Sequence, residues 1–206
     1  MYTGIVKAVL KVTELNDSEG LRSLTLDFTD PLLEQLEIGA SVAIDGVCLS
    51  VVTIKGTAVS FDAMQETLAK TTLGQLRPGD TVNVERSAKQ GAEVGGHILS
   101  GHIEGMARVS AIRTEPNNHI VSFAFPADWS DYIFHKGFIA INGASLTVFR
   151  ESKENEFQVY FIPETLRSTT FANKKVGDRV NIEIDHQTKV IVNTVRNYLA
   201  NQQAKA

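Results

Sequence analysis

The sequence has a single cysteine, Cys48, in 206 residues. An internal disulfide is therefore excluded, and any thiol chemistry must come from this one position. Chains without disulfides are typical of reducing compartments, so we expect a cytoplasmic protein.

Long hydrophobic runs and an excess of basic residues are also missing. No apolar run approaches the length of a membrane span, and the N-terminus "MYTGIVKAVLKV" lacks the charged start and apolar core of a signal peptide. The formal net charge is −4, which argues against a nucleic-acid or membrane partner. No phosphate-binding loop or dinucleotide fingerprint occurs. His97 and His102 are five residues apart on a predicted strand and point to opposite faces, so no metal site is expected.

What the sequence does contain is an internal repeat. "VAIDGVCLSV" from Val42 returns as "IAINGASLTV" from Ile139. "QETLAKTTLGQLRPGDTVNVERS" from Gln65 returns as "PETLRSTTFANKKVGDRVNIEID" from Pro163. The repeat divides the chain into a first module over 1–97, a second over 98–186 and a tail over 187–206, and two copies favour a duplicated closed domain over a solenoid.

Each module is rich in short, alternating, β-branched segments such as "AVSFDAM" and "EFQVYFI". Asp45-Gly46 and Asn142-Gly143 are hairpin signals. Five or six strands in about 90 residues predict a small closed barrel, so the fold class is all-β with two tandem barrels. The tail predicts a helix, with Ile191, Val195, Tyr198 and Leu199 on one face. That face would pack on its own barrel or on another copy.

The two copies differ where chemistry is possible. Cys48 corresponds to Ser145, Ser41 to Phe138 and, at an offset of 98, Gly4 to His102. A thiol on one side and an imidazole on the other suggest a composite site with two unlike sides. A buried Cys48 serving as a small hydrophobe is the competing interpretation. We expect His97 to be structural, bonding backbone carbonyls of the linker.

Hydroxyl side chains flank both repeated turns: Ser41, Ser50, Ser145 and Thr147. Together they suggest a lining for a polyol or heterocycle, and the two "ETL" turns suit the edge of a flat ring. Taken alone, Lys136 is an ordinary surface lysine and Asp62 an acid at a turn.

The ordered, duplicated motifs "TGIV", "DGVCLSV", "GGHILSGHIEG", "NGASLTV", "PETLRSTT" and "GDRVNIEID" resemble the riboflavin synthase family of the alpha-chain type. The resemblance covers the whole chain. It implies two six-stranded Greek-key β-barrels with a C-terminal α-helix, assembled as a homotrimer. It implies that two molecules of 6,7-dimethyl-8-ribityllumazine exchange a four-carbon unit, giving riboflavin and 5-amino-6-ribitylamino-uracil without a metal or cofactor. The active site would hold both substrates between the first barrel of one subunit and the second barrel of a neighbour.

The family's site residues transfer position by position. The first-barrel pocket would be Gly4, Ile5, Val6, Cys48, Leu49, Ser50, Asp62, Ala63, Met64, Gln65, Glu66, Thr67, Gly101, His102 and Ile103. The second-barrel pocket would be Lys136, Ser145, Leu146, Thr147, Phe161, Ile162, Pro163, Glu164, Thr165 and Leu166. The catalytic candidates are Cys48, His102, Ser145, Ser41 and Lys136. We expect His102 to act as a base or relay, and Cys48 or Ser145 to activate attack on the ring.

This chain departs from the family's common pattern at a few positions. Tyr2 replaces a usual Phe, Ser50 a Thr, Asn142 an Asp and Glu104 an Asp, while Asp45 stands where Asn is frequent. The Asn142 change puts an acid-base role near the second pocket in doubt. The alternative function is a non-enzymatic antenna that binds one lumazine or flavin per chain in the first barrel. The retained Cys48, His102, Ser145 and second "PETL" favour the enzyme.

Overall fold

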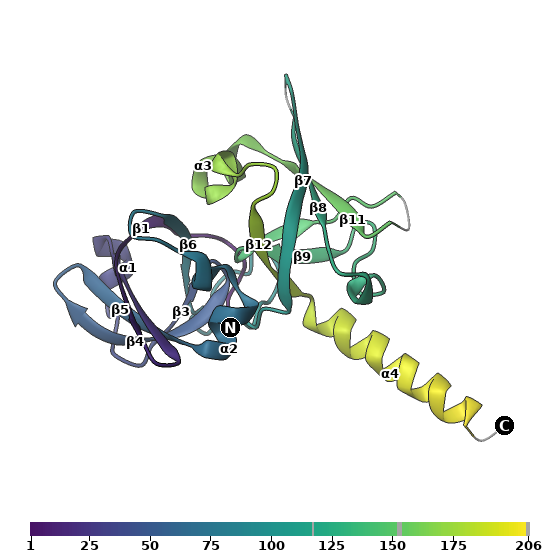
Figure 1. Cartoon of the computed structure of the whole chain (residues 1–206), viewed down its shortest axis with the longest axis horizontal. Coiled ribbons are helices and arrows are strands. Elements are labelled where there is room, and N and C mark those ends of the chain that lie inside the picture. The colour runs from purple at the N-terminus through teal and green to yellow at the C-terminus, as the bar shows by residue number, and fades with distance from the viewer. Residues whose placement is uncertain (117, 152–153, 205–206) are drawn as a thin grey trace.

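The computed structural model describes residues 1–116, 118–151 and 154–204. Two six-stranded antiparallel sheets lie side by side, and one helix extends away from them (Figure 1). The mostly β fold class predicted from the repeat is confirmed.

The first half of the chain forms a closed barrel of six strands in the order β1-β2-β5-β4-β3-β6. The strands β3, β4 and β5 are consecutive neighbours, and β2 returns to lie beside β5, which is a Greek-key arrangement. The strands are β1 (Ala8–Ser18), β2 (Leu21–Asp27), β3 (Ser41–Ile44), β4 (Val47–Lys55), β5 (Ala58–Met64) and β6 (Thr81–Arg86). The short helices are α1 (Asp30–Leu33), α2 (Gln65–Lys70) and η1 (Thr72–Gln75).

The second half repeats this ring with one seam opened. Its order, β10-β9-β12-β7-β8-β11, is the order of the first barrel cut between the counterparts of β4 and β5. A single bridge spans the seam, where Phe149 and Gln158 exchange backbone hydrogen bonds of 2.8 and 2.7 Å. The strands are β7 (Gly105–Glu115), β8 (Asn118–Ala124), β9 (Phe138–Ile141), β10 (Ala144–Thr147), β11 (Glu156–Phe161) and β12 (Arg179–Ile184). The short helices are η2 (Ala127–Trp129), α3 (Pro163–Ser168) and η3 (Thr170–Asn173).

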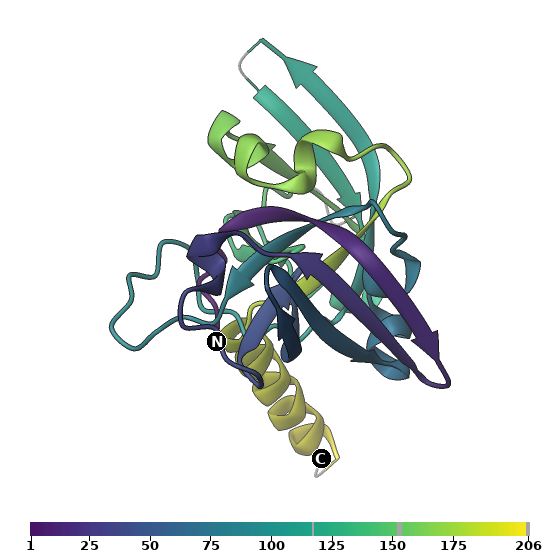
Figure 2. The ribbon, with the colours of Figure 1, turned by 90° about the vertical axis from the view of Figure 1, so that its left-hand side faces the viewer.

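The predicted terminal helix is α4 (His186–Gln203). It begins at Asp185, whose carboxylate accepts a 2.8 Å hydrogen bond from the Thr188 backbone N–H, as an N-cap does. Figures 1 and 2 both show α4 projecting beyond the two halves. Its apolar side chains at Ile191, Val195, Tyr198 and Leu199 are therefore more than half exposed.

Each half has its own apolar core, because alternate strand residues point inward. The first core contains Leu24, Phe61 and Val82 with no exposed surface. The second is built around Phe123 and Phe157, whose rings stack 5.4 Å apart.

The two halves meet at their hairpin turns. A Cβ atom on Gly46 would lie 2.6 Å from the Gly143 backbone nitrogen, so only glycine allows this approach. Asp45 and Asn142, which precede these glycines, both have positive φ and both are buried. Asn142 is fully buried, and its Oδ1 accepts a 2.7 Å hydrogen bond from the Asn181 backbone N–H. These contacts indicate that Asn142 stabilises the boundary between the two halves.

Two connecting segments, residues 2–6 and 99–103, cross between the halves. They meet where Tyr2 and Leu99 exchange backbone hydrogen bonds of 2.8 and 3.0 Å. Glu85 accepts hydrogen bonds from Thr3 and Gly4, and Glu183 accepts the matching bonds from Ser100 and Gly101. The buried carboxylates, repeated in both copies of the sequence, thus fix the two crossing segments.

This crossing corrects one predicted equivalence. Gly4 corresponds to Gly101 and not to His102, because both glycines have positive φ and occupy matching positions above Glu85 and Glu183. Equivalent residues of the two copies are 97 positions apart in this segment and 98 positions apart from the "ETL" turns onward. Applying the spacing of 98 to the whole chain therefore matched Gly4 with the wrong residue. His102 therefore corresponds to Ile5.

Candidate functional site

The pocket of the second half is closed by the N-terminal segment. The Ser145 backbone N–H donates a 2.8 Å hydrogen bond to the Gly4 carbonyl, and a Cβ on Gly4 would lie 2.5 Å from Ser145 Cβ. Val6 packs against the second core. The expectation that Gly4, Ile5 and Val6 belong to the first-barrel pocket is therefore corrected. The segment crosses over and lies against the second half.

A hollow of about 400 Å³ opens beside Ser145. Predicted site residues from three parts of the second half line it: Lys136, Ser145, Leu146, Thr147, Ile162 and Thr165. Val148, Phe149, Val159 and Tyr160 complete the lining. The Lys136 ammonium lies 5.8 Å from the centre of the Phe149 ring. The hollow thus combines apolar walls with a cation and four hydroxyl-bearing side chains, a composition that suits a flat polar ring.

The other crossing segment lies against the predicted pocket residues of the first half in the same way. The Cys48 backbone N–H donates a 3.0 Å hydrogen bond to the Gly101 carbonyl, and Ile103 packs against the first core. Ser41 and Ser50 are paired across β3 and β4, as Phe138 and Thr147 are across β9 and β10. The predicted equivalences of Ser41 with Phe138 and of Cys48 with Ser145 therefore follow the strand register.

The remaining predicted residues of this pocket surround that pair of strands. The Asp62 carboxylate accepts a 2.5 Å hydrogen bond from the Ser23 hydroxyl. Met64, at the start of α2, is 69% exposed, and its counterpart Ile162 is 61% exposed. Such exposed apolar side chains at both pocket mouths are available to a ring or to another protein copy.

The helical turns beside the pockets are also duplicated. In α2 the Lys70 ammonium lies 2.8 Å from Glu66, and in α3 Arg167 lies 2.5 Å from Glu164. Both pairs are exposed, so they contribute little to stability. The two "ETL" segments thus lie in equivalent short helices, α2 and α3.

His102 does not join Cys48 through any side-chain hydrogen bond within residues 1–116, 118–151 and 154–204. Its exposed side chain lines a separate hollow of about 510 Å³, together with Ile103, Lys70 and residues of α4. The structure thus brings Cys48 next to Gly101, whereas the imidazole of His102 faces α4.

The two equivalent residues Cys48 and Ser145 have unlike polar partners. Tyr2 donates its hydroxyl to Cys48 Sγ at 3.0 Å. His97 Nδ1 lies 2.6 Å from Ser145 Oγ, and the imidazole stacks on Phe138 with centroids 5.1 Å apart. Each half therefore has a different hydrogen-bonding group beside its variable position.

Sequence reasoning missed the place of His97 in this site. It was expected to bond linker carbonyls, but its Nδ1 contacts Ser145, and its Nε2 is buried without a hydrogen-bond partner among the described residues. Burial lowers the pKa of His97, which favours the neutral ring at pH 7 and lets Nδ1 accept from the Ser145 hydroxyl. The glycine-rich "GGHILSGH" was the available signal, because Gly96 has space only for hydrogen beside Ser145.

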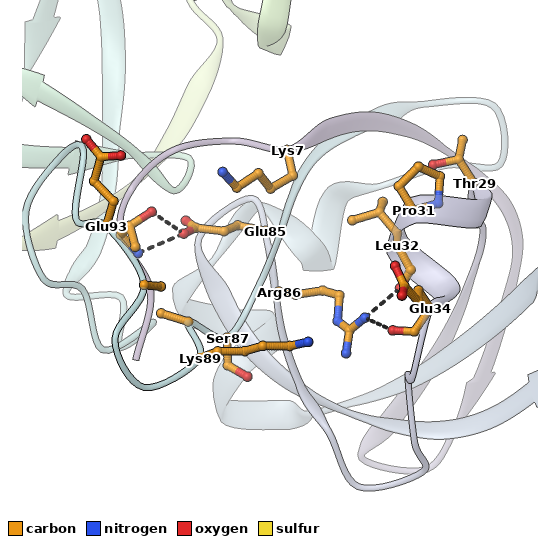
Figure 3. A pocket seen from close by; sticks show the side chains of 13 residues that line it. Lys7, Thr29, Pro31, Leu32, Glu34, Glu85, Arg86, Ser87, Lys89 and Glu93 are labelled. Atoms are coloured by element: carbon orange, nitrogen blue, oxygen red, sulfur yellow. Dashed lines mark hydrogen bonds between the residues drawn. The ribbon is translucent and has the colours of Figure 1, made fainter.

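Another hollow, of about 600 Å³, lies away from these residues (Figure 3). It lies between β6, the following linker and α1. Its floor is structural: Arg86 donates to the carbonyls of Leu32, Glu34 and Gln35, and Glu85 binds Thr3. No predicted site residue lines it.

The described residues contain no cluster of three His, Cys, Asp or Glu side chains that could hold a metal ion. In the same part of the chain, no helix has the length and apolarity needed to span a bilayer.

Comparison with known proteins gives the class of these paired pockets. The model of the lumazine binding domain matches the chain twice, over residues 3–87 and 100–185. The crystal structure of LumP complexed with 6,7-dimethyl-8-(1'-D-ribityl) lumazine is similar, with a TM-score of 0.81 and 27% identity over 89% of this chain and 99% of that one.

Curated relatives narrow the class. Riboflavin synthase from Escherichia coli (strain K12) is 48% identical over 97% of this chain and 94% of its own length. Riboflavin synthase from Chlamydia pneumoniae is 42% identical over 97% of this chain and 98% of its own. The chain belongs to the riboflavin synthase family.

Proposed function

We propose that this chain is an enzyme that converts two molecules of 6,7-dimethyl-8-ribityllumazine into riboflavin and 5-amino-6-ribitylamino-uracil. The observation that carries the proposal is that the two halves hold Cys48 and Ser145 in equivalent backbone frames with unlike side-chain partners. The near full-length identity to riboflavin synthases supports it. The two products together contain the atoms of the two substrates, so the exchange needs no external oxidant or reductant.

The reaction uses two copies of one molecule in different roles. A duplicated fold supplies two similar pockets, and the divergent residues make one a donor site and the other an acceptor site. Holding two rings at reacting distance can lower the barrier by about 7–11 kcal/mol through proximity alone. The acceptor's two methyl carbons form bonds to the four-carbon unit, and the donor's two carbon–nitrogen bonds to that unit break. Proton transfer from the 7-methyl group and attack at C7 are the steps that need acid-base help, which we assign to Cys48, His102, Ser145, Ser41 and Lys136 as a group.

Among the catalytic candidates, Ser145 has a hydroxyl with a hydrogen-bond acceptor beside it. His97 Nδ1 at 2.6 Å can take the Ser145 hydroxyl proton, which would make the oxygen a better nucleophile or base. This arrangement supports an activating role for Ser145 in the second pocket. His102, exposed in one copy, would need a neighbouring copy to bring a substrate to it.

The proposal includes two lumazine-binding modules, 1–97 and 98–186, and a trimerisation helix over 187–206. The exposed apolar stripe of α4 supports the helix as a contact between copies. A homotrimer would bring the first barrel of one subunit to the second barrel of another. A cytoplasmic location, supported by the single unpaired cysteine, belongs to the same proposal.

The test is an assay without cofactors. Purified protein is incubated with 6,7-dimethyl-8-ribityllumazine, and riboflavin is followed by its visible absorbance. Formation of riboflavin at half the molar amount of lumazine consumed supports the enzyme. Binding of one ligand per chain without turnover would instead support the antenna. His102→Gln is the first variant to assay, and unchanged turnover would remove His102 from the catalytic group.

A further inference from the structure

Tyr2 is buried at the boundary between the two halves, with 2% of its surface exposed. Its ring packs in a small cluster with Ala43 of β3, Ala140 of β9 and Leu99. Its hydroxyl reaches out of this cluster to Cys48 Sγ, 3.0 Å away. A buried tyrosine hydroxyl requires a partner, and here the partner is the sulfur.

The contact is fixed from three directions. Tyr2 is tied to Leu99 by two backbone hydrogen bonds, and the Cys48 N–H is tied to the Gly101 carbonyl. A Cβ on Gly101 would lie 2.5 Å from Cys48 Cβ and 2.9 Å from the Tyr2 ring. The tyrosine, the cysteine and the glycine therefore pack against one another with no spare space.

The hydroxyl remains a donor at any ordinary pH. Burial raises the pKa of Tyr2 far above its usual value, and the hydrogen bond to Cys48 and the nearby carboxylates of Glu85 and Glu183 raise it further. Because the tyrosine keeps its proton, the sulfur accepts this bond and cannot direct its own hydrogen along the same line.

We propose that Tyr2 is a positioning residue for Cys48, holding the sulfur in one orientation toward the first pocket and stabilising negative charge on it. The inference rests on the proposed function only in that Cys48 acts on substrate there. Hydrogen bonds to a charged acceptor are stronger than those to a neutral one, so this contact would strengthen when negative charge develops on the sulfur during attack.

The second pocket offers no equivalent contact. The counterpart of Tyr2 is Leu99, which has no polar side-chain atom, and Ser145 is served by His97. Cys48 therefore receives a hydrogen bond from a permanent donor, whereas Ser145 faces a group that can accept one. The crossing segments thus add to the chemical difference between the pockets.

The test uses Cys48 as its own probe, because it is the only cysteine. Alkylation by iodoacetamide is timed by mass spectrometry in the full-length protein, the Tyr2→Phe variant and a Thr57→Ala control, which removes an exposed hydroxyl in the turn between β4 and β5. Phe keeps the ring in its cluster, so the variant should fold. Cys48→Ser, which should not be alkylated, verifies the site of labelling.

Tyr2→Phe should slow alkylation about three- to tenfold, the size of one hydrogen bond, and Thr57→Ala should leave it unchanged. Tyr2→Phe should also lower kcat for riboflavin formation while KM stays within about twofold, since the aromatic ring at position 2 remains. An unchanged alkylation rate, or an unchanged kcat, overturns the proposal. If the wild-type protein makes no riboflavin but Tyr2→Phe still slows alkylation, the proposed function fails and the Tyr2–Cys48 relationship stands.

Discussion

Asn83 and Asn181 each donate a side-chain hydrogen bond to the opposite half of the molecule. Asn83 Nδ2 binds the Asn142 carbonyl and Asn181 Nδ2 binds the Asp45 carbonyl, both at 2.9 Å. Their Oδ1 atoms accept from the backbone N–H groups of Thr170 and Thr72, at 2.9 and 2.7 Å. Both asparagines are buried, so these four bonds replace water at the boundary. The two halves are joined by a polar network as much as by apolar packing.

Asn181→Ala should therefore destabilise the whole chain. The variant leaves the Thr72 N–H and the Asp45 carbonyl buried without their partners, at a combined cost of about 2–4 kcal/mol. Denaturant unfolding measures the change, with the exposed Asn173→Ala as a control expected to stay within about 0.5 kcal/mol. A loss below about 1 kcal/mol would show that water or a shifted backbone replaces the bonds.

The pair Asp45 and Asn142 predicts a pH dependence with a definite sign. Burial raises the pKa of the Asp45 carboxyl from 3.8 to about 6, against the opposing effects of Lys174 and the hydrogen bond from the Asn83 N–H. The folded state thus binds the proton more tightly than the unfolded state. The stability that protonated Asp45 contributes is fully present below its unfolded-state pKa of 3.8 and is lost as pH rises through about 6.

Asp45→Asn should remove this loss, because the uncharged side chain already works at position 142. The free energy of unfolding at neutral pH should rise by about 1–3 kcal/mol, and its slope between about pH 4 and pH 6 should flatten. Asn142→Asp is the matched opposite and should add a second loss over a similar range. Parallel pH profiles for wild type and Asp45→Asn would contradict the assignment.

Substitutions at two glycines with similar backbone angles can distinguish the cost of backbone strain from the cost of steric collision. Gly101 and Gly91 have φ of +79° and +80°, but a Cβ on Gly91 meets nothing within 4 Å, whereas one on Gly101 meets Cys48. Gly91→Ala should cost about 1 kcal/mol of stability from φ alone. Gly101→Ala should cost about 1–3 kcal/mol more and should weaken ligand binding in the first pocket, because Cys48 must move. Thermal unfolding and lumazine fluorescence titration measure the two effects.

The exposed stripe of α4 predicts how copies associate. If the proposed homotrimer forms through this stripe, the double variant Ile191→Asp, Val195→Asp should give monomers in sedimentation analysis and abolish riboflavin formation, because charges would face the apolar contact. Asn197→Asp, on the other side of the helix, is the control and should leave assembly intact. Monomers that retain full activity would contradict the composite site.

The sequence was informative wherever the repeat was in register. The β-branched alternation predicted the strands, and the Asp45-Gly46 and Asn142-Gly143 pairs predicted the hairpin turns that the structure contains. The apolar spacing after residue 186 predicted α4. These features depend on local propensity and burial, which a single chain records directly.

The site could be predicted only in part, because its residues are joined by contacts that are not local. Gly4 lies against Ser145, and Gly101 lies against Cys48, so each crossing segment belongs to the half to which sequence order does not assign it. The resemblance placed residues 101–103 with the first half, as the structure does, but it also kept residues 4–6 there. A one-residue change in offset matched Gly4 with His102 instead of Gly101. His97 escaped notice because the sequence cannot show that its ring stacks on Phe138 and reaches a serine 48 positions away.

The crossing of residues 2–6 with residues 99–103 has a consequence for synthesis on the ribosome. Residues 2–6 make contacts with Ser145, which is translated much later. Contacts between distant positions close slowly, because loop entropy opposes them. During synthesis this segment can already bind Glu85, but its contact with Ser145 must wait until most of the second half has emerged. A nascent chain stalled before that point could hold residues 99–103 against the first barrel, while the Gly4 carbonyl would still lack the Ser145 N–H.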